Sequence, residues 1–259
     1  MAGPVDDLEG ALAPFREHAA SALIAADFDG TLSPIVDDPA AAAPLDGVAA
    51  VLDELAGRYG EVAVVSGRPL DFLDRWFPHP SDVTLVGLYG LEVRRRGRRE
   101  DHATSGVWRE TMADVAGLAR LQGPPEMDVE LKGLSITLHY RRHPEIEAQV
   151  ERWAEQIARP AGIRVRSAKK SVELHPPIDE DKGTVLQRLA AELDGPVLFA
   201  GDDLGDVPAF EYLGGLRASG RPVLRVAVDG PEVPDALADV ADLLVDGPAA
   251  VAGLLDHLR

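Results

Sequence analysis

The sequence predicts an α/β fold, with a Rossmann-like parallel-sheet core, helices on both faces of the sheet and an inserted α+β domain. Two observations predict the core. Short apolar runs such as 23–26 and 197–200 are typical of strands buried inside a parallel sheet, and segments with helical spacing alternate with them. After residue 104 this alternating pattern changes, which predicts the insert.

Composition limits the classes of protein that the chain can belong to. Its 259 residues, 46% of them hydrophobic, are enough for one large α/β domain or a core with a smaller insert. The chain has no cysteine, which excludes disulfides, thiolate catalysis and thiolate metal sites, so a metal must be held by oxygen or imidazole. A net charge of −18 argues against general binding of nucleic acid or anionic membranes.

Two charged segments complete this picture. The basic run 94–99 has five arginines, and we interpret it as a solvated hairpin. The segment 1–17 carries Asp6, Asp7 and Glu9 and lacks both a basic start and a long apolar core, so it resembles neither a signal peptide nor a membrane anchor. We therefore expect a cytoplasmic protein that binds neither nucleic acid nor membranes. We also expect it to be a monomer.

The first acidic motif is Asp27-Phe28-Asp29-Gly30-Thr31-Leu32, directly after the strand 23–26. Parallel sheets place ligands at the carboxyl ends of their strands, where both acids lie. Two acids two residues apart repel each other unless a cation or a proton lies between them, so the spacing indicates a divalent metal, and oxygen ligands favour Mg²⁺. The alternative is that the two acids only cap a turn.

A βαβ unit follows. Leu45, Val48, Leu52 and Leu55 recur at helical spacing before Gly57, and 62–65 is again a short apolar strand. This strand ends in Ser66-Gly67-Arg68-Pro69, whose hydroxyl and guanidinium can hold an anion. The alternative is that Ser66 caps a helix over 70–77. A strand over 83–88 and a hairpin partner over 91–95 come next.

The insert combines helices with strands that we expect to be antiparallel. Its helices are predicted near 108–121 and around Ile146, Val150, Trp153 and Ile157, and its strands over 127–131, 135–140, 163–167 and 172–174. We place its boundaries at 104 and 176, which leaves 1–103 and 177–259 as the core, with Pro176-Pro177 as a stiff hinge. Glu130, Lys132, His139, Arg141, Lys169 and Glu173 either face water or recognise a polyhydroxylated ligand.

After the insert, the alternation of helices and strands resumes. Lys182-Gly183 opens a helix with Leu186, Leu189 and Leu193, and the strand 197–200 leads into Gly201-Asp202-Asp203-Leu204-Gly205-Asp206. Because this strand also delivers carboxylates to the carboxyl edge of the sheet, both acidic clusters can meet at one cation. Strands over 223–228 and 242–245 and a helix over 248–255 complete the core.

In order and spacing, the pieces around Asp27, Ser66, Lys182 and Asp202 resemble the haloacid dehalogenase superfamily of phosphotransferases, and the insert is similar in position and size to its mobile cap. More narrowly, the chain resembles trehalose-6-phosphate phosphatases. The segments that carry this resemblance are Asp-x-Asp-Gly-Thr-Leu, Ser-Gly-Arg, 130–135 with 138–141, Val172-Glu173-Leu174 and Gly201-Asp202-Asp203. The chain departs from the family where Gly205, Val207 and Pro208 replace Thr, Glu and Asp, and where Tyr89 replaces His.

The resemblance implies a Mg²⁺-dependent phosphatase of trehalose biosynthesis that acts on a phosphorylated disaccharide through an aspartyl-phosphate. Asp27 would be the nucleophile and Asp29 the general acid and base. The implied ligands fall into three sets: Asp27, the backbone carbonyl of Asp29 and Asp202 for the metal; Thr31, Ser66, Arg68 and Lys182 for the phosphate; and Glu130, Lys132, Arg141, Lys169 and Glu173 on the cap for the sugar. Whether Asp203 and Asp206 touch the metal stays open. The alternatives are another sugar-phosphate or mannosyl-3-phosphoglycerate-type phosphatase, or a catalytically silent binding module.

Overall fold

The computed structural model describes residues 8–36, 38–77, 80–101, 105–168, 170–230 and 233–259. The chain divides into two compact units, one formed by Met1–Glu100 and Glu180–Arg259 and the other by Asp101–Asp179. The boundaries of the second unit lie three residues outside those expected from the sequence, at 101 against 104 and at 179 against 176.

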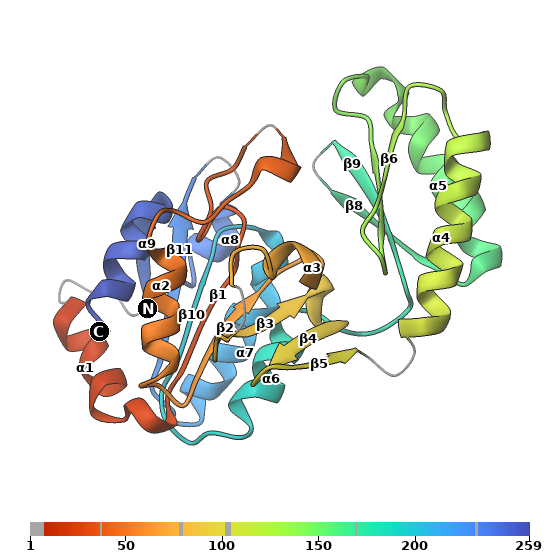
Figure 1. Ribbon diagram of the computed structural model, residues 1–259. Coiled ribbons are helices and arrows are strands. Elements are labelled where there is room, and N and C mark those ends of the chain that lie inside the picture. The colour runs from red at the N-terminus through yellow and green to blue at the C-terminus, as the bar shows by residue number, and fades with distance from the viewer. Residues whose placement is uncertain (1–7, 37, 78–79, 102–104, 169, 231–232) are drawn as a thin grey trace. The chain divides into compact units, whose positions relative to one another are not determined.

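The first unit is built on an eight-stranded sheet of order β12-β11-β10-β1-β2-β3-β4-β5 (Figure 1). Six neighbouring strands run parallel, namely β12 (Leu243–Asp246), β11 (Val223–Asp229), β10 (Val197–Gly201), β1 (Leu23–Ala26), β2 (Glu61–Val65) and β3 (Thr84–Gly87). β4 (Glu92–Arg95) returns antiparallel to β3, and β5 (Arg98–Asp101) forms the edge. The predicted α/β class is confirmed.

Helices cover both faces of this sheet. α1 (Leu8–Glu17), α2 (Val48–Ala56), α3 (Leu70–Leu73) and α9 (Gly247–Asp256) contribute to the hydrophobic core on one face, where Ile24 and Ala26 of β1 point. α6 (Lys182–Ala190), α7 (Val207–Ala218) and α8 (Asp235–Ala238) cover the other face, where Leu23 and Ala25 point. β1 is therefore buried on both sides, which explains its unbroken apolar sequence.

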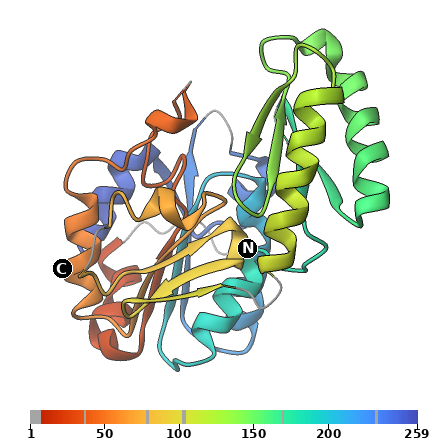
Figure 2. The same ribbon diagram turned by 45° about the vertical axis from the view of Figure 1, so that its right-hand side comes forward.

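The second unit is a four-stranded antiparallel sheet of order β6-β7-β9-β8. Its strands are β6 (Asp128–Leu131), β7 (Ile136–His139), β9 (Ser171–His175) and β8 (Arg164–Ala168). α4 (Ser105–Gln122) and α5 (Glu147–Ala161) pack on one face of this sheet, over Ile136, Leu138, Val172 and Leu174 (Figure 2). This is the α+β organisation expected of the insert.

Short 3₁₀ segments connect the larger elements: η1 (Ala19–Ser21), η2 (Pro39–Ala41), η3 (Leu88–Gly90), η4 (Pro144–Ile146) and η5 (Leu204–Asp206). Among the described residues, no helix has both the length and the apolar character needed to cross a membrane.

Two sequence interpretations are wrong in detail. The helix expected over 70–77 ends at Leu73. The hairpin at 92–101 forms, but its arginines are not simply solvated: Arg94 is only 3% exposed and donates hydrogen bonds to the Asp74 carboxylate and the Phe77 carbonyl, and Arg95 pairs with Glu61. The run of arginines does not reveal these acidic and carbonyl partners, because the partners lie far from the run in the sequence.

Candidate active site

Asp27 lies at the carboxyl end of the central strand. β1 pairs with β10 on one side and β2 on the other, and the backbone N–H of Asp27 donates to the Ala200 carbonyl at 2.9 Å. The residue is only 4% exposed. The strand therefore places one carboxylate in a buried position at the sheet edge where parallel sheets bind ligands.

Lys182 is the cation that faces this carboxylate. Asp181 caps the start of α6 in a capping box with Thr184, which puts Lys182 in the first turn of the helix, where it is 2% exposed. Its Nζ lies 2.8 Å from Asp27 Oδ1 and 2.6 Å from Asp206 Oδ1. Burial alone would lower the pKa of Lys182, but Asp206 and Asp27 raise this pKa well above its ordinary value, so the ammonium stays charged.

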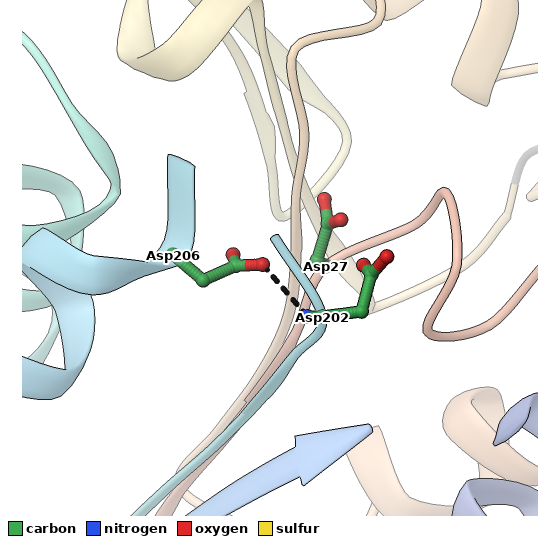
Figure 3. A group of neighbouring side chains, drawn as sticks. All are labelled: Asp27, Asp202 and Asp206. Atoms are coloured by element: carbon green, nitrogen blue, oxygen red, sulfur yellow. Dashed lines mark hydrogen bonds between the residues drawn. The ribbon is translucent and has the colours of Figure 1, made fainter. Parts of the chain in front are cut away.

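Asp206 organises the turn after β10. The sequence leaves the role of this residue open, and the structure buries it completely. Its Oδ1 accepts from Lys182. Its Oδ2 accepts the backbone N–H of Asp202 at 2.9 Å, the bond drawn in Figure 3, and that of Asp203 at 3.1 Å. Both oxygens therefore have partners, and Asp206 is better placed to hold Lys182 and the turn of Asp202 than to bind an ion.

Asp27, Asp202 and Asp206 form the acidic cluster in Figure 3, and each offers one oxygen within 4.8 Å of the others. Burial, together with the charges of Asp206 and Asp203, raises the pKa of Asp202 to about 8, although Lys182 and a hydrogen bond from Thr31 oppose this. Burial also raises the pKa of Asp27 well above its ordinary value, an effect that Lys182 only partly offsets.

The charge of this cluster and its donor atoms both fit a divalent cation. Three carboxylates face one ammonium, so two negative charges lack compensation within the cluster when all three are ionised. Oxygen-only ligands suit a hard cation such as Mg²⁺. The side chain of Asp29 lies outside the cluster, so a contribution from Asp29 would have to come from its backbone carbonyl.

The side chain of Asp29 instead contacts Arg68, the residue expected to bind phosphate. Arg68 Nε donates to Asp29 Oδ2 and Nη2 to Oδ1, both at 2.7 Å, while Nη1 donates to the Pro39 carbonyl at 2.8 Å. The guanidinium also lies over the Phe72 ring, 4.5 Å from its centroid. The structure therefore brings Asp29 and Arg68 together as a two-bond ion pair.

Ser66 is buried at the end of β2, and its Oγ accepts the backbone N–H of Arg68 at 3.1 Å. It does not cap α3, because Pro69 stands at the N-cap position and makes no side-chain hydrogen bond. The capping alternative for Ser66 is thus wrong. Tyr89 lies beside the same loop, since a Cβ added to Gly67 would meet the Tyr89 hydroxyl at 2.6 Å.

In the second unit, three of the expected sugar ligands lie together. Lys132 Nζ is 3.8 Å from Glu130 Oε2 and also 3.8 Å from Glu173 Oε1. His139 Nε2 and Glu130 Oε2 are hydrogen-bonded at 2.9 Å. Arg141 is exposed in the turn after β7, and Lys169 lies outside the described residues.

Thr137 is a polar residue of this sheet that the sequence reasoning missed. It pairs with Glu130 on one side and Glu173 on the other, and it is buried. Within the described ranges its hydroxyl has no hydrogen-bond partner. The signal was present in the alternation Ile136-Thr137-Leu138-His139, which places Thr137 on the same face as His139.

Similarity to known proteins extends over most of the chain. A family model described as trehalose-phosphatase matches residues 25–238. The trehalose-phosphate phosphatase of Mycobacterium avium (strain 104) is 33% identical over 249 residues, which cover 90% of this chain and 60% of that protein. This chain thus spans only about 60% of the length of that relative.

Solved structures with the same fold are also known. The C-terminal domain of C. albicans trehalose-6-phosphate phosphatase is 27% identical with a TM-score of 0.75, over 98% of this chain and 97% of that one. A haloacid dehalogenase-like hydrolase from Bacteroides thetaiotaomicron is 15% identical with a TM-score of 0.60, over 92% and 99%. This second likeness concerns the fold alone.

Proposed function

Because the chain belongs to the trehalose-phosphatase family, we propose that it hydrolyses trehalose 6-phosphate to trehalose and inorganic phosphate. The observation that carries the proposal is the position of Asp27, a buried carboxylate at the end of the central strand, 2.8 Å from Lys182 Nζ and grouped with Asp202. Phosphoryl transfer depends on positioning and on charge that stabilises the phosphoryl oxygens, and this cluster can provide both.

In the first step, a carboxylate oxygen of Asp27 forms a bond to phosphorus while the bond between phosphorus and the sugar oxygen breaks. The electron pair of the broken bond stays on the sugar oxygen, which takes a proton from Asp29. Trehalose leaves, and Asp27 carries the phosphoryl group as an aspartyl-phosphate.

In the second step, a water oxygen attacks phosphorus and its proton passes to Asp29. The bond between phosphorus and Asp27 breaks, and its electron pair returns to the carboxylate. Inorganic phosphate leaves, and both acids regain their starting states, so the cycle balances.

Phosphate binding falls to Thr31, Ser66 and Lys182 in this account. All three are buried, and they follow β1, follow β2 and open α6, respectively. A magnesium ion would be held by Asp27 and Asp202, with the backbone carbonyl of Asp29 implied by the family. The ion would supply positive charge to the phosphoryl oxygens.

Recognition of the sugar is assigned to the second unit, as the cap of the enzyme. Lys132 with Glu130 and Glu173 offers one ammonium and two carboxylates within 3.8 Å contacts, a donor and acceptor set that suits the hydroxyl groups of a disaccharide. Arg141 and Lys169 keep their family assignment as further contacts. The monomeric state and the cytoplasmic location stay predictions.

Phosphate release across a panel of esters, with Mg²⁺ present, tests this function. We expect kcat/KM for trehalose 6-phosphate to exceed that for glucose 6-phosphate by at least roughly tenfold, because the second glucose adds hydrogen bonds of about 1 kcal/mol each. A preference for glucose 6-phosphate or for mannosyl-3-phosphoglycerate would favour the alternative phosphatases. No release from any ester would favour the silent binding module.

A further inference from the structure

Arg68 pairs with Asp29, two residues after Asp27 of the acidic cluster, and the family resemblance places Arg68 among the phosphate ligands. The contacts of Arg68 in the structure indicate a different role. We infer that Arg68 is a positioning residue that acts on the reaction through Asp29 and does not bind the phosphate itself. This inference rests on the proposed function, because it assigns a role to Asp29 in that reaction.

Each of the three guanidinium nitrogens of Arg68 donates a hydrogen bond. Nε and Nη2 hold the two oxygens of Asp29, each at 2.7 Å, and Nη1 holds the Pro39 carbonyl at 2.8 Å. The Arg68 side chain is 14% exposed and that of Asp29 31%. A fork that donates to both oxygens of one carboxyl group fixes its orientation as well as its position. Each oxygen keeps a second lone pair, which can carry the proton that Asp29 donates. To bind phosphate through the edge formed by Nε and Nη2, Arg68 would have to release Asp29.

The backbone of Arg68 is also fixed in place. Its N–H donates to Ser66 Oγ at 3.1 Å, and its carbonyl accepts the N–H of Leu88 at 3.0 Å. Two residues later, the N–H of Leu70 donates to the buried carboxylate of Glu92 at 2.8 Å. These contacts come from Ser66 directly after β2, from η3 and from β4, so the loop that carries Arg68 is anchored to the sheet by contacts other than those with Asp29.

The Phe72 ring supports the guanidinium on a further side. Arg68 lies 4.5 Å from the ring centroid and Arg75 lies 4.1 Å from the same centroid. The two arginines share this aromatic contact, but Asp29 is held by Arg68. Arg75 is therefore a matched control, an arginine that stacks on the same ring and has no place in the proposed machinery.

Positioning of Asp29 matters for one class of substrate more than for another. A sugar alcohol is a poor leaving group, so the sugar oxygen must receive the proton of Asp29 as its bond to phosphorus breaks. A p-nitrophenolate leaves as an anion and needs no proton. Because kcat/KM covers only the steps up to loss of the alcohol or phenol, it isolates this difference from hydrolysis of the aspartyl-phosphate.

A double-mutant cycle of Arg68→Gln and Asp29→Asn tests the inference. We expect Arg68→Gln to lower kcat/KM for trehalose 6-phosphate roughly 10- to 100-fold, the size of a lost charged hydrogen bond, and that for p-nitrophenyl phosphate less than about threefold. In the Asp29→Asn background, Arg68→Gln should cost less than about threefold with either substrate. The inhibition constant of inorganic phosphate should stay within about threefold of the parent value.

Two further variants control for a purely structural effect of the Arg68 substitution. Arg75→Gln should leave both kcat/KM values within about threefold of the parent values. Arg68→Lys keeps the charge and one donor nitrogen but loses the planar fork, so it should recover only part of the activity toward the sugar phosphate. If Arg68→Gln fails to fold, as judged by thermal unfolding, the same cycle is run with Arg68→Lys.

Three results would each contradict the inference. Equal losses with both substrates, a loss that persists in the Asp29→Asn background, or an inhibition constant of inorganic phosphate raised at least roughly tenfold would make Arg68 a phosphate ligand and overturn the inference. A parent that releases phosphate from no ester would overturn the proposed function and the inference together. An active parent with an additive cycle would overturn the inference alone.

Discussion

The α-carbon of Gly30 lies against the carboxylate of Asp202, so closely that a Cβ on Gly30 would stand 1.9 Å from Asp202 Oδ2. Gly30 also has a φ of +77°, a conformation that side-chain-bearing residues rarely adopt. The turn after β1 and the turn after β10 thus meet through a glycine, and any side chain at this position would displace a proposed metal ligand.

Gly30→Ala should therefore abolish phosphate release, since the new methyl group and Asp202 cannot both keep their places. Gly47→Ala is the matched control, because Gly47 has a similar φ of +86° but no atom within 4 Å of the added Cβ. Backbone strain alone costs roughly 1–2 kcal/mol in either variant. Similar activity in the two variants, at similar melting temperatures, would contradict the close contact.

Magnesium should stabilise the protein through the acidic cluster. At 100 times its Kd, a ligand of the folded state adds about 2.7 kcal/mol to the free energy of unfolding, which raises the melting temperature. Asp202→Asn should lose this increase. Without metal, this variant should be at least as stable as the parent, because it removes a buried carboxyl group whose pKa is raised to about 8 and which is therefore costly to ionise in the folded state.

The control for that experiment is Asp194→Asn, the same change at an exposed position before β10. It should keep the full response to Mg²⁺. Activity that survives exhaustive EDTA treatment, or an Mg²⁺ response that persists in Asp202→Asn, would argue against the cluster as the metal site.

The cap assignment predicts a selective defect. Glu130→Ala or Lys132→Ala should lower kcat/KM for trehalose 6-phosphate by at least roughly tenfold, the effect of losing a charged hydrogen bond to the sugar. Both variants should hydrolyse an aryl phosphate nearly as well as the parent. Glu155→Ala, at an exposed position of α5, serves as the control with no expected change. Equal losses of kcat/KM for both substrates would show that these residues do not recognise the sugar.

A pH dependence of stability follows from His175 in β9. Burial, with a further contribution from Arg166, lowers the pKa of His175 below its ordinary value. The unfolded chain takes up this proton near pH 6.5 and the folded chain only at lower pH, so the stability that neutral His175 contributes is present above about pH 6.5 and lost as pH falls. In urea unfolding, the parent should lose stability relative to His175→Gln as pH falls below about 6.5. A constant difference would contradict this assignment.

The sequence was sufficient to predict the fold and the sheet-edge carboxylates, but not the side-chain pairings. Strand β1 and Asp27 could be predicted because a short run buried on both faces is apolar throughout. The helix α7 was missed, because Gly214 and Gly215 weaken its helical signal. The Asp29 to Arg68 pair joins residues 39 positions apart, and no spacing in a single sequence reveals it. The double role of Asp206 depends in the same way on where Lys182 comes to lie.

Phosphate release from trehalose 6-phosphate by the parent and by Asp27→Asn, with Mg²⁺ present, tests the central claim most directly. The substitution keeps the shape of the side chain but removes the nucleophilic oxygen anion. We predict that the parent releases phosphate and that Asp27→Asn is slower by at least roughly 10⁴-fold, with a melting temperature no lower than that of the parent. An Asp27→Asn variant that stays folded and turns over trehalose 6-phosphate at the parental rate would contradict the mechanism.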